Sequence, residues 1–388
     1  MEVKQIYEIM NDVTSEILGK TDLITEDLQG IVDVGNEIFN VSAVDKYVRT
    51  LINRIGKVIF VNRPYAGSAP SVLMDSWEFG SVLQKIQAEL PAATENESWE
   101  LEDGQSYDPN IFYKPVVSAK FYNNKVTFEI PISITELQVK QSFTSAEQLN
   151  SFISMIYNEV DKSMTIKVDS LIMRTINNFI AETLYDLDNT GDFGGKSGVR
   201  ARNLLYEYNE QFNQTLAAEN ALTTPEFIRF AAYEIGLASD RLTKISTLFN
   251  LGGKARFTPR DLQHVVMLAD FKRAADVYLQ SDTYNEQFTR LLDSETVPYW
   301  QASGQSYAFG DVSAIDVVTS ENHTVSITGV LGVIFDRDAL GVSNYDRRTT
   351  SNYNAKAEFT NNWFKMDSSY FNDFNENGIV FYIADDEE

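Results

Sequence analysis

The sequence contains no cysteine and only two histidines among its 388 residues. The lack of cysteine excludes disulfide bridges, thiolate zinc sites and cysteine nucleophiles. His264 and His323 lie far apart with no companion ligands, so they do not predict a metal site, and serine–histidine–aspartate hydrolysis lacks its usual base. His264, which precedes the apolar run VVMLA, is predicted to lie at a strand end. We therefore predict no catalytic, cofactor-binding or metal-binding residues and expect a protein that is not an enzyme.

Basic residues are also scarce: 32 lysines and arginines stand against 56 acids, for a net charge of -24. This balance disfavours a dedicated nucleic-acid binder, which needs a basic patch. It suits a soluble protein, or a surface that lies near nucleic acid without adhering to it. No apolar run reaches the length of about 18 residues typical of a membrane span, and the N-terminal segment MEVKQIYEIM is unlike a signal peptide. We expect a soluble protein made in a cytoplasm.

One glycine-rich stretch, NTGDFGGKSGVR at residues 189–200, resembles the end of a phosphate-binding loop. The motif requires G-x-x-x-x-G-K-[ST], but Thr190 stands where its first glycine belongs. The same stretch lacks the final glutamate of a calcium loop, because Ser197 occupies that position. We interpret it as a flexible connection that follows a helix.

The N-terminal region, residues 1–56, is predicted to form amphipathic helices. Ile6, Met10 and Val13 follow helical spacing and share one face. This arm has no core of its own, so we expect its apolar face to pack on something else. A strand and a loop rich in proline, glycine and serine are predicted over 57–75.

Two strand-like runs, at 78–90 and 116–133, flank an acidic, turn-rich segment. The second run alternates well and contains a predicted turn at Asn123-Asn124. Together they predict an extended two-stranded loop, and an isolated hairpin of this kind is marginal in water. We expect a neighbouring molecule to complete it through aromatic residues near its tip, which are Trp99, Phe112 and Tyr113. The alternative is an irregular insertion folded back on its own domain.

The strongest local pattern predicts one long helix at about 145–185. Thr144 and Glu147 form a capping box, and neither proline nor glycine interrupts the apolar positions that follow at three- and four-residue steps. A helix of roughly 40 residues spans about 60 Å. Its spacing departs from strict heptads, which favours a spine lying across a sheet over a free coiled coil.

The rest of the chain alternates between strand and helix patterns, and residues 200–342 are predicted to form one compact α/β unit. A helix begins at Pro225, RLTKISTLFN is predicted as a strand, and QHVVMLADFKRAADVYLQ as a strand followed by a helix. ARNLLYEYNEQF fits a strand or a short helix. AIDVVT and TGVLGVIF predict further strands, and the aromatic C-terminal part predicts two or three more, ending in GIVFYIA.

This order of parts resembles the major capsid proteins of tailed bacteriophages, which have the Hong Kong 97-type fold. The segment GVLGVIFDRDALGVSNYDRRTTSNYNAKAEFTNNWF carries the resemblance in sequence. The resemblance implies an α+β fold with four parts: an N-terminal arm (1–75), an extended loop (76–134), a peripheral domain with the spine helix (135–195 and 343–388), and an axial domain (196–342).

The resemblance also implies a structural function. Pentamers and hexamers of the chain would assemble in the host cytoplasm into an icosahedral shell around double-stranded DNA, without sequence-specific DNA binding. Implied partners are a scaffolding protein, a portal protein and a decoration protein, with no membrane and no cofactor. Contacts between subunits would involve the arm and the loop, with candidates Ile6, Met10, Val13, Trp99, Phe112 and Tyr113.

Three other interpretations remain. An encapsulin-like compartment shell would share the fold. A carboxylate- or nucleotide-using enzyme would need a site that the motifs above do not supply. A phage tail or adhesion protein is usually all-β, which the long helix disfavours. Lysine–asparagine crosslinks occur in some capsids, but no motif assigns that chemistry here to Lys85, Lys120 or Lys125.

Overall fold

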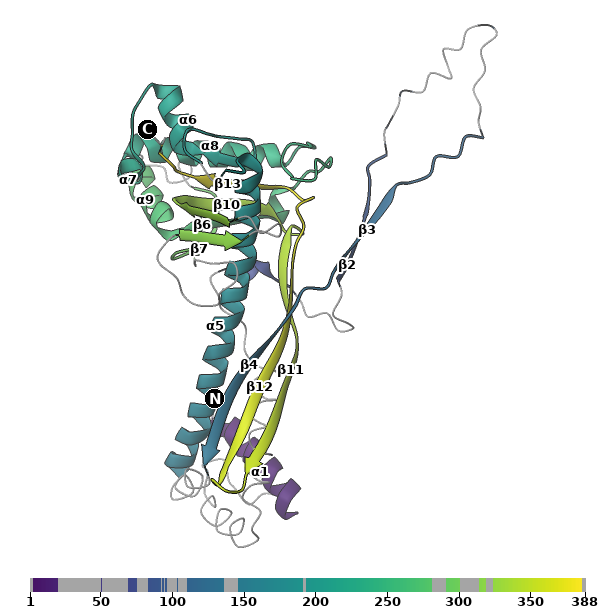
Figure 1. Cartoon of the computed structure of the whole chain (residues 1–388), viewed down its shortest axis with the longest axis vertical. Helices are drawn as coiled ribbons and strands as arrows, with labels where there is room; N and C mark the ends of the chain where they lie inside the picture. The colour runs from purple at the N-terminus through teal and green to yellow at the C-terminus, as the bar shows by residue number, and fades with distance from the viewer. Residues whose placement is uncertain are drawn as a thin grey trace.

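A long helix forms the axis of the molecule, with one sheet along its lower part and a second sheet beside its upper end (Figure 1). The computed structural model describes residues 3–19, 50, 69–74, 83–91, 93, 95, 103, 110–135, 146–190, 193–280, 291–300, 314–318 and 324–385. The helices predicted over 20–49 and the strand predicted after residue 57 fall outside these residues, as does Trp99.

The axial helix α5 spans Ala146–Leu187, which confirms the predicted long helix. Its buried side chains recur at three- and four-residue steps, so they form a continuous apolar stripe along the helix. The stripe includes Ile156, Val160, Met164, Val168, Leu171, Ile172, Ile176, Phe179 and Ile180. Because a sheet and a helix both expose an apolar face, this stripe must be covered, and the lower sheet covers much of it.

The lower sheet has four strands in the order β1-β11-β12-β4. They span Leu73–Met74 (β1, after the 3-10 turn Pro70–Val72), Leu340–Asn354 (β11), Phe359–Asn372 (β12) and Lys125–Thr135 (β4). Antiparallel pairing sets Met366 opposite Phe128 and Phe364 opposite Ile130. Alternate residues of β4 face the helix, as the sequence pattern predicts.

The N-terminal helix α1, Val3–Leu18, lies at the end of the lower sheet farthest from the upper one (Figure 1). Met10 and Val13 have no exposed surface and belong to the same core as α5 and the sheet. The Thr14 hydroxyl donates to the Met10 carbonyl at 2.7 Å. The apolar face of this helix therefore packs against its own chain.

The upper sheet has five strands in the order β5-β13-β10-β6-β7. They span Ala201–Asn203 (β5), Gly378–Tyr382 (β13), Val330–Asp336 (β10), Gln263–Leu268 (β6) and Glu295–Val297 (β7). Its helices, which carry a second apolar core, are α6 (Leu204–Phe212), α7 (Ala218–Ala221), α8 (Pro225–Leu242) and α9 (Ala269–Gln280).

Two features of the upper unit differ from the sequence prediction. β13 comes from the segment 343–388, which was predicted to belong wholly to the other unit, yet β13 pairs with β10 and β5. Its five residues are all buried, which is the pattern of a central strand rather than an edge. RLTKISTLFN is not a strand, because α8 continues to Leu242 and only the bridge Ser246–Arg256 follows.

Other parts match or refine the prediction. ARNLLYEYNEQF contains both options, since β5 leads directly into α6, whose first turn is capped by the Asn203 side chain. The predicted strand–helix unit is β6 followed by α9. Ala314–Val318 (β8) pairs with Thr324–Thr328 (β9) in a separate two-stranded sheet that lies against α5 rather than in the five-stranded sheet.

A two-stranded ribbon leaves the body where the two sheets meet (Figure 1). It consists of Leu83–Ala88 (β2) and Val117–Tyr122 (β3), paired antiparallel, which confirms the extended loop. Asn123-Asn124 is not a hairpin turn. The chain instead passes there from the ribbon into β4 of the lower sheet.

Gly378, the first residue of β13, tests how tightly the two units pack on the helix. A Cβ at this position would lie 2.4 Å from Cζ of Phe179 in α5. We expect Gly378→Ala to lower the free energy of unfolding by about 1–3 kcal/mol through overpacking. The control is Gly236→Ala in α8, where a Cβ meets open space; it should raise stability by about 0.5–1 kcal/mol. Denaturant unfolding measures both, and equal effects would contradict the tight packing at Gly378.

Candidate assembly site at the base of the extended ribbon

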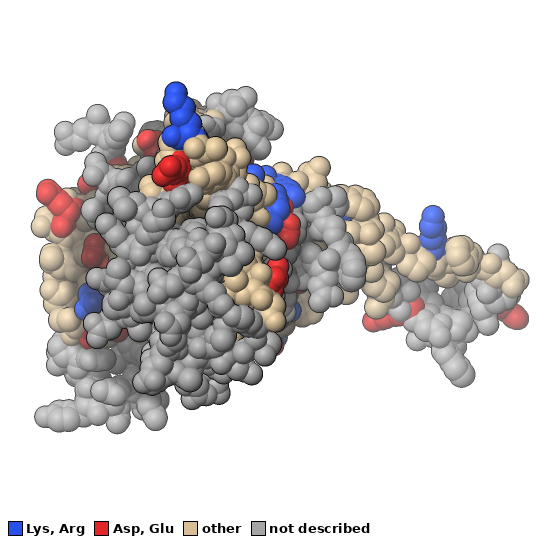
Figure 2. All heavy atoms as spheres, turned by 90° about the horizontal axis from the view of Figure 1, so that it is seen from below, with Lys and Arg blue, Asp and Glu red and all other residues tan. Residues whose placement is uncertain are grey.

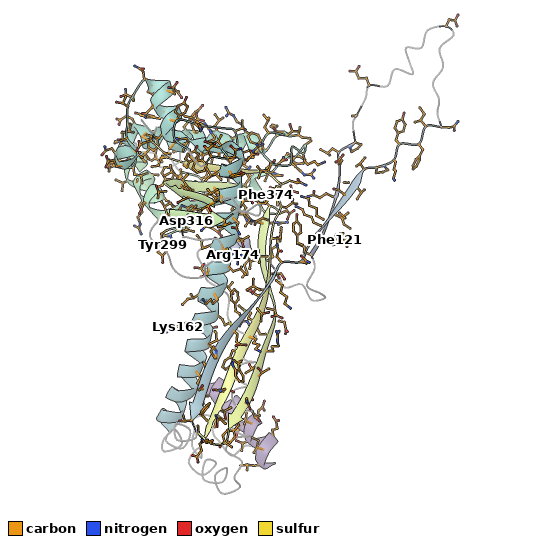
Figure 3. The ribbon with its side chains drawn as sticks, viewed as in Figure 1. Phe121, Lys162, Arg174, Tyr299, Asp316 and Phe374 are labelled. Atoms are coloured by element: carbon orange, nitrogen blue, oxygen red, sulfur yellow. The ribbon has the colours of Figure 1, made fainter. Side chains whose placement is uncertain are left out.

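The ribbon has two chemically different faces because its strands pair in register. One face carries Leu83, Lys85, Gln87, Ser118, Lys120 and Tyr122, and the other carries Gln84, Ile86, Ala88, Val117, Ala119 and Phe121. On the second face Ile86 is 64% exposed and Phe121 is 65% exposed. Figure 3 shows Phe121 on the ribbon beside the body. The ribbon therefore turns polar groups toward its own body and apolar groups to solvent.

The polar face is held by two carboxylates of the body. Lys85 Nζ lies 2.9 Å from Asp373 Oδ2 and 2.8 Å from Glu376 Oε1, and it donates to the Asp338 carbonyl at 3.0 Å. Lys120 Nζ lies 2.7 Å from Asp373 Oδ1. The Asp373 side chain has 0% exposed surface, so these two lysines compensate a fully buried charge.

Glu376 joins the ribbon to a loop of the upper unit. Gln87 donates a hydrogen bond to Glu376, and Arg256 Nε lies 3.6 Å from its other oxygen. Arg256 also donates to Gln87 Oε1 at 2.7 Å, and Lys254 lies 2.9 Å from Glu89. The last pair is about half exposed on both sides and therefore contributes little.

The environment of Asp373 shifts two pKa values. Burial by itself raises the pKa of Asp373, but the hydrogen bonds from Lys120 and Lys85 outweigh burial and hold it below the ordinary value of 3.8. Burial, together with the charge of Asp373, raises the pKa of the Tyr122 hydroxyl. At neutral pH the carboxylate is therefore ionised and the phenol is neutral.

The acceptors lie in one short turn between β12 and β13, residues 373–377, which we name the junction turn. The Phe374 ring stacks on Phe179 of α5 with centroids 5.7 Å apart (Figure 3). Asn377 Nδ2 donates to the Thr258 hydroxyl of the upper unit at 3.2 Å. Lys85 of the ribbon is bound at the same turn. The junction turn thus contacts the spine helix, the upper unit and the ribbon.

The chain just before β3 forms an exposed segment that carries several apolar residues. Phe112 is 85% exposed and Tyr113 is 81% exposed, and Ile111 and Val116 beside them are also exposed. Figure 2 views the molecule along its long axis. The described part of the ribbon and of this segment extends to one side of the body, and most of its residues are neither acidic nor basic (Figure 2). These side chains leave apolar surface exposed to solvent in the single chain.

The structure separates the predicted contact residues. Phe112 and Tyr113 are exposed, whereas Met10 and Val13 are fully buried within their own chain. The reason is that α1 packs into the core shared by α5 and the lower sheet. The backbone of Ile6 lies in α1, and Trp99 lies outside the described residues.

The sequence analysis did not predict the role of the junction turn. Asp373 and Glu376 occur in a polar stretch, DFNEN, that carries no motif. The one available signal is on the ribbon side, where Lys85 and Gln87 alternate with Ile86 in a strand.

The glycine-rich stretch is tied down in its described residues. Lys196 pairs with Asp188, and the Tyr382 hydroxyl donates to the Lys196 carbonyl at 2.9 Å. The Phe193 ring is buried and packs edge-on against Tyr382. The joint between α5 and β5 is therefore anchored to β13, rather than loose as the glycines predict.

Within the described part of the chain, no group of three histidine, aspartate or glutamate side chains could hold a metal ion. None of the described helices is long and apolar enough to cross a membrane.

Comparisons with known proteins agree with this architecture. A chain from the structure of the head fiber and inner core protein gp22 of native bacteriophage P68 matches with a TM-score of 0.50 at 12% identity, covering 84% of this chain and 86% of that one. The capsid structure of Staphylococcus phage Andhra matches with a TM-score of 0.49 at 11% identity, covering 83% and 86%. No match was found among curated protein sequences.

The spine helix, its sheet, the upper α/β unit and the projecting ribbon together define a capsid protein of the Hong Kong 97-type fold, which confirms the predicted fold class. The family described as Phi29-like phage major capsid protein matches residues 8–382, and the chain belongs to this family. It is a structural protein of the virion capsid that forms an icosahedral shell, and it is not an enzyme. The encapsulin-like alternative is not favoured.

The buried carboxylate predicts a specific acid sensitivity. Because its pKa in the folded chain is depressed, the ionised Asp373 stabilises the fold above about pH 4, and this stabilisation is lost as the pH falls through the folded-state pKa. Asp367 of β12 should act in the same way with a pKa of about 2, since the hydrogen bonds from Arg348, Thr127 and Lys125 outweigh its burial.

Urea midpoints between pH 6 and pH 2.5 measure this effect. We expect wild-type stability to fall across that range, and Asp373→Asn to be less stable than wild type at pH 6 but with a shallower dependence on pH. Parallel curves for the two proteins would contradict the ion-pair account.

Proposed function

We propose that this capsid protein assembles as pentamers and hexamers, and that the ribbon docks on another copy of the chain through its exposed apolar face. The observation that carries this proposal is the pair Ile86 and Phe121, both more than 60% exposed on a strand face that turns away from the body. Soluble two-stranded sheets normally hide such a face. A shell made of many copies supplies the covering surface.

The segment after the tip extends the proposed contact. Phe112 and Tyr113 are neighbours in the chain, and both are highly exposed, so the segment offers aromatic surface to another copy. Phe112, Tyr113 and Trp99 remain our proposed contacts. For Ile6 the same role stays a proposal, whereas Met10 and Val13 could serve only if α1 packed on a different copy.

The proposed division of the chain follows from these contacts. The arm (1–75) begins with α1 on the core of its own chain, the loop (76–134) reaches toward neighbours, residues 135–195 with most of 343–388 form the peripheral domain, and 196–342 form the axial domain. The axial sheet also needs β13, so we propose to assign Gly378–Tyr382 to it.

The proposed partners are packaged double-stranded DNA, a scaffolding protein, a portal protein and a decoration protein. A net charge of -24 supports enclosing DNA without binding it tightly, because like charges repel at short range. The scaffolding, portal and decoration proteins are proposed from the resemblance to tailed-phage capsids alone.

Replacing the central apolar residue of the ribbon tests the docking. We expect Phe121→Ser to abolish shells in negative-stain microscopy, because a polar side chain removes the apolar anchor. Its thermal unfolding as a monomer should stay within about 0.5 kcal/mol of wild type, since the ring is mostly exposed in the single chain. The matched control is Gln84→Ser, at the position directly opposite on the same face. Normal shells from Phe121→Ser would overturn the proposal.

Deleting residues 92–113 tests the distal part separately. We expect assembly to fail while the circular dichroism and unfolding midpoint of the monomer persist, because Phe112 and Tyr113 cover no part of the chain's own core. Loss of all folding would show that the segment belongs to the core and is not a reaching loop.

A further inference from the structure

The ribbon is attached to the body mainly through charged and polar groups. Its inward face presents Lys85, Gln87 and Lys120 to Asp373 and Glu376. One aromatic contact accompanies them, between Tyr122 and Phe371 with ring centroids 5.1 Å apart. This composition is unusual for an element that must hold its place, because buried ion pairs contribute less to stability than apolar packing of similar volume.

Ion pairs do fix the position of one element relative to another. Apolar burial is non-directional and tolerates sliding, whereas a carboxylate that accepts from two ammonium groups fixes the position of both. Lys85 and Lys120 lie directly opposite each other on the two strands, and each binds a different oxygen of Asp373. Any rotation of the ribbon about its base would break at least one of these contacts and leave a buried charge without compensation.

We propose that Asp373 and Glu376 are positioning residues that set the direction in which the ribbon leaves the body, and hence the geometry with which one copy docks on the next. This inference deepens the proposed function, since it takes docking by the ribbon as given. The charge cluster of Lys85, Lys120, Asp373 and Glu376 sets the angle between the ribbon and the body. The apolar outer face of the ribbon provides the contact with the next copy.

The junction turn fixes the direction of the ribbon relative to both the spine helix and the upper unit. Phe374 stacks on Phe179 of the spine helix, and Asn377 Nδ2 donates to the Thr258 hydroxyl of the upper unit at 3.2 Å. Arg256, from the same unit, lies against Glu376 and Gln87. The ribbon is therefore aligned to the spine and to the upper unit at once, through five consecutive residues.

Three variants separate positioning from a merely structural role. Lys85→Met with Lys120→Met removes both cations and leaves Asp373 buried without them. Adding Asp373→Asn removes that uncompensated charge while the ribbon stays unanchored. Lys85→Arg with Lys120→Arg keeps the charges. Lys365→Met, which breaks a surface pair with Glu129 at 3.1 Å on the lower sheet, is the control.

Amide hydrogen exchange of residues 83–88 and 117–122, the melting temperature and particle size by electron microscopy are the readouts. We expect exchange in the ribbon of the double methionine variant to be about tenfold faster or more, because a free two-stranded ribbon is marginal in water. Its melting temperature should fall. The triple variant should recover most of the melting temperature but keep the fast ribbon, and its shells should vary in diameter. The arginine variant and the control should resemble wild type.

Two results would overturn the inference. One is unchanged ribbon exchange in the double methionine variant. The other is a triple variant that recovers neither its melting temperature nor the protection of β6 and β10, which would make the cluster a general stabiliser. The assembly of Phe121→Ser tests the docking proposal independently. Normal shells from that variant would overturn docking by the ribbon, and the exchange data would still show whether the charge cluster holds the ribbon.

Discussion

The carboxylate of Asp373 constrains the whole molecule, because a fully buried charge must be compensated where it lies. Its cations come from Lys85 and Lys120, more than 250 positions earlier in the chain. The body therefore reaches its lowest free energy only when the ribbon is in place. The ion pairs of Asp373 thus link the placement of the ribbon to the stability of the body.

The periodicity of apolar residues predicted individual helices and strands. The stripe from Ile156 to Ile180 indicated α5 within a few residues at either end, and the alternation in β4 indicated which face meets the core. These patterns are local, because helix and strand periods depend only on neighbouring residues. The family resemblance then supplied the arrangement of the parts, which the structure confirms.

Long-range pairing could not be predicted in the same way. The run GIVFYIA indicates a buried strand, but nothing in it specifies pairing with β10 rather than with the lower sheet. The charge cluster is harder still, since Asp373 and Glu376 have no sequence pattern that links them to Lys85. RLTKISTLFN shows the opposite error: its apolar residues resemble a strand, yet Ile245 and Leu248 lie exposed in a turn region.

The place of β13 has a consequence for synthesis. This strand lies inside the upper sheet, between β5 and β10, yet it leaves the ribosome after every other described strand. The residues just before it form the junction turn. A nascent chain that stops short of residue 373 therefore lacks an interior strand of the upper sheet and both carboxylates that bind the ribbon. The upper sheet is therefore complete only after the last described strand has been synthesised.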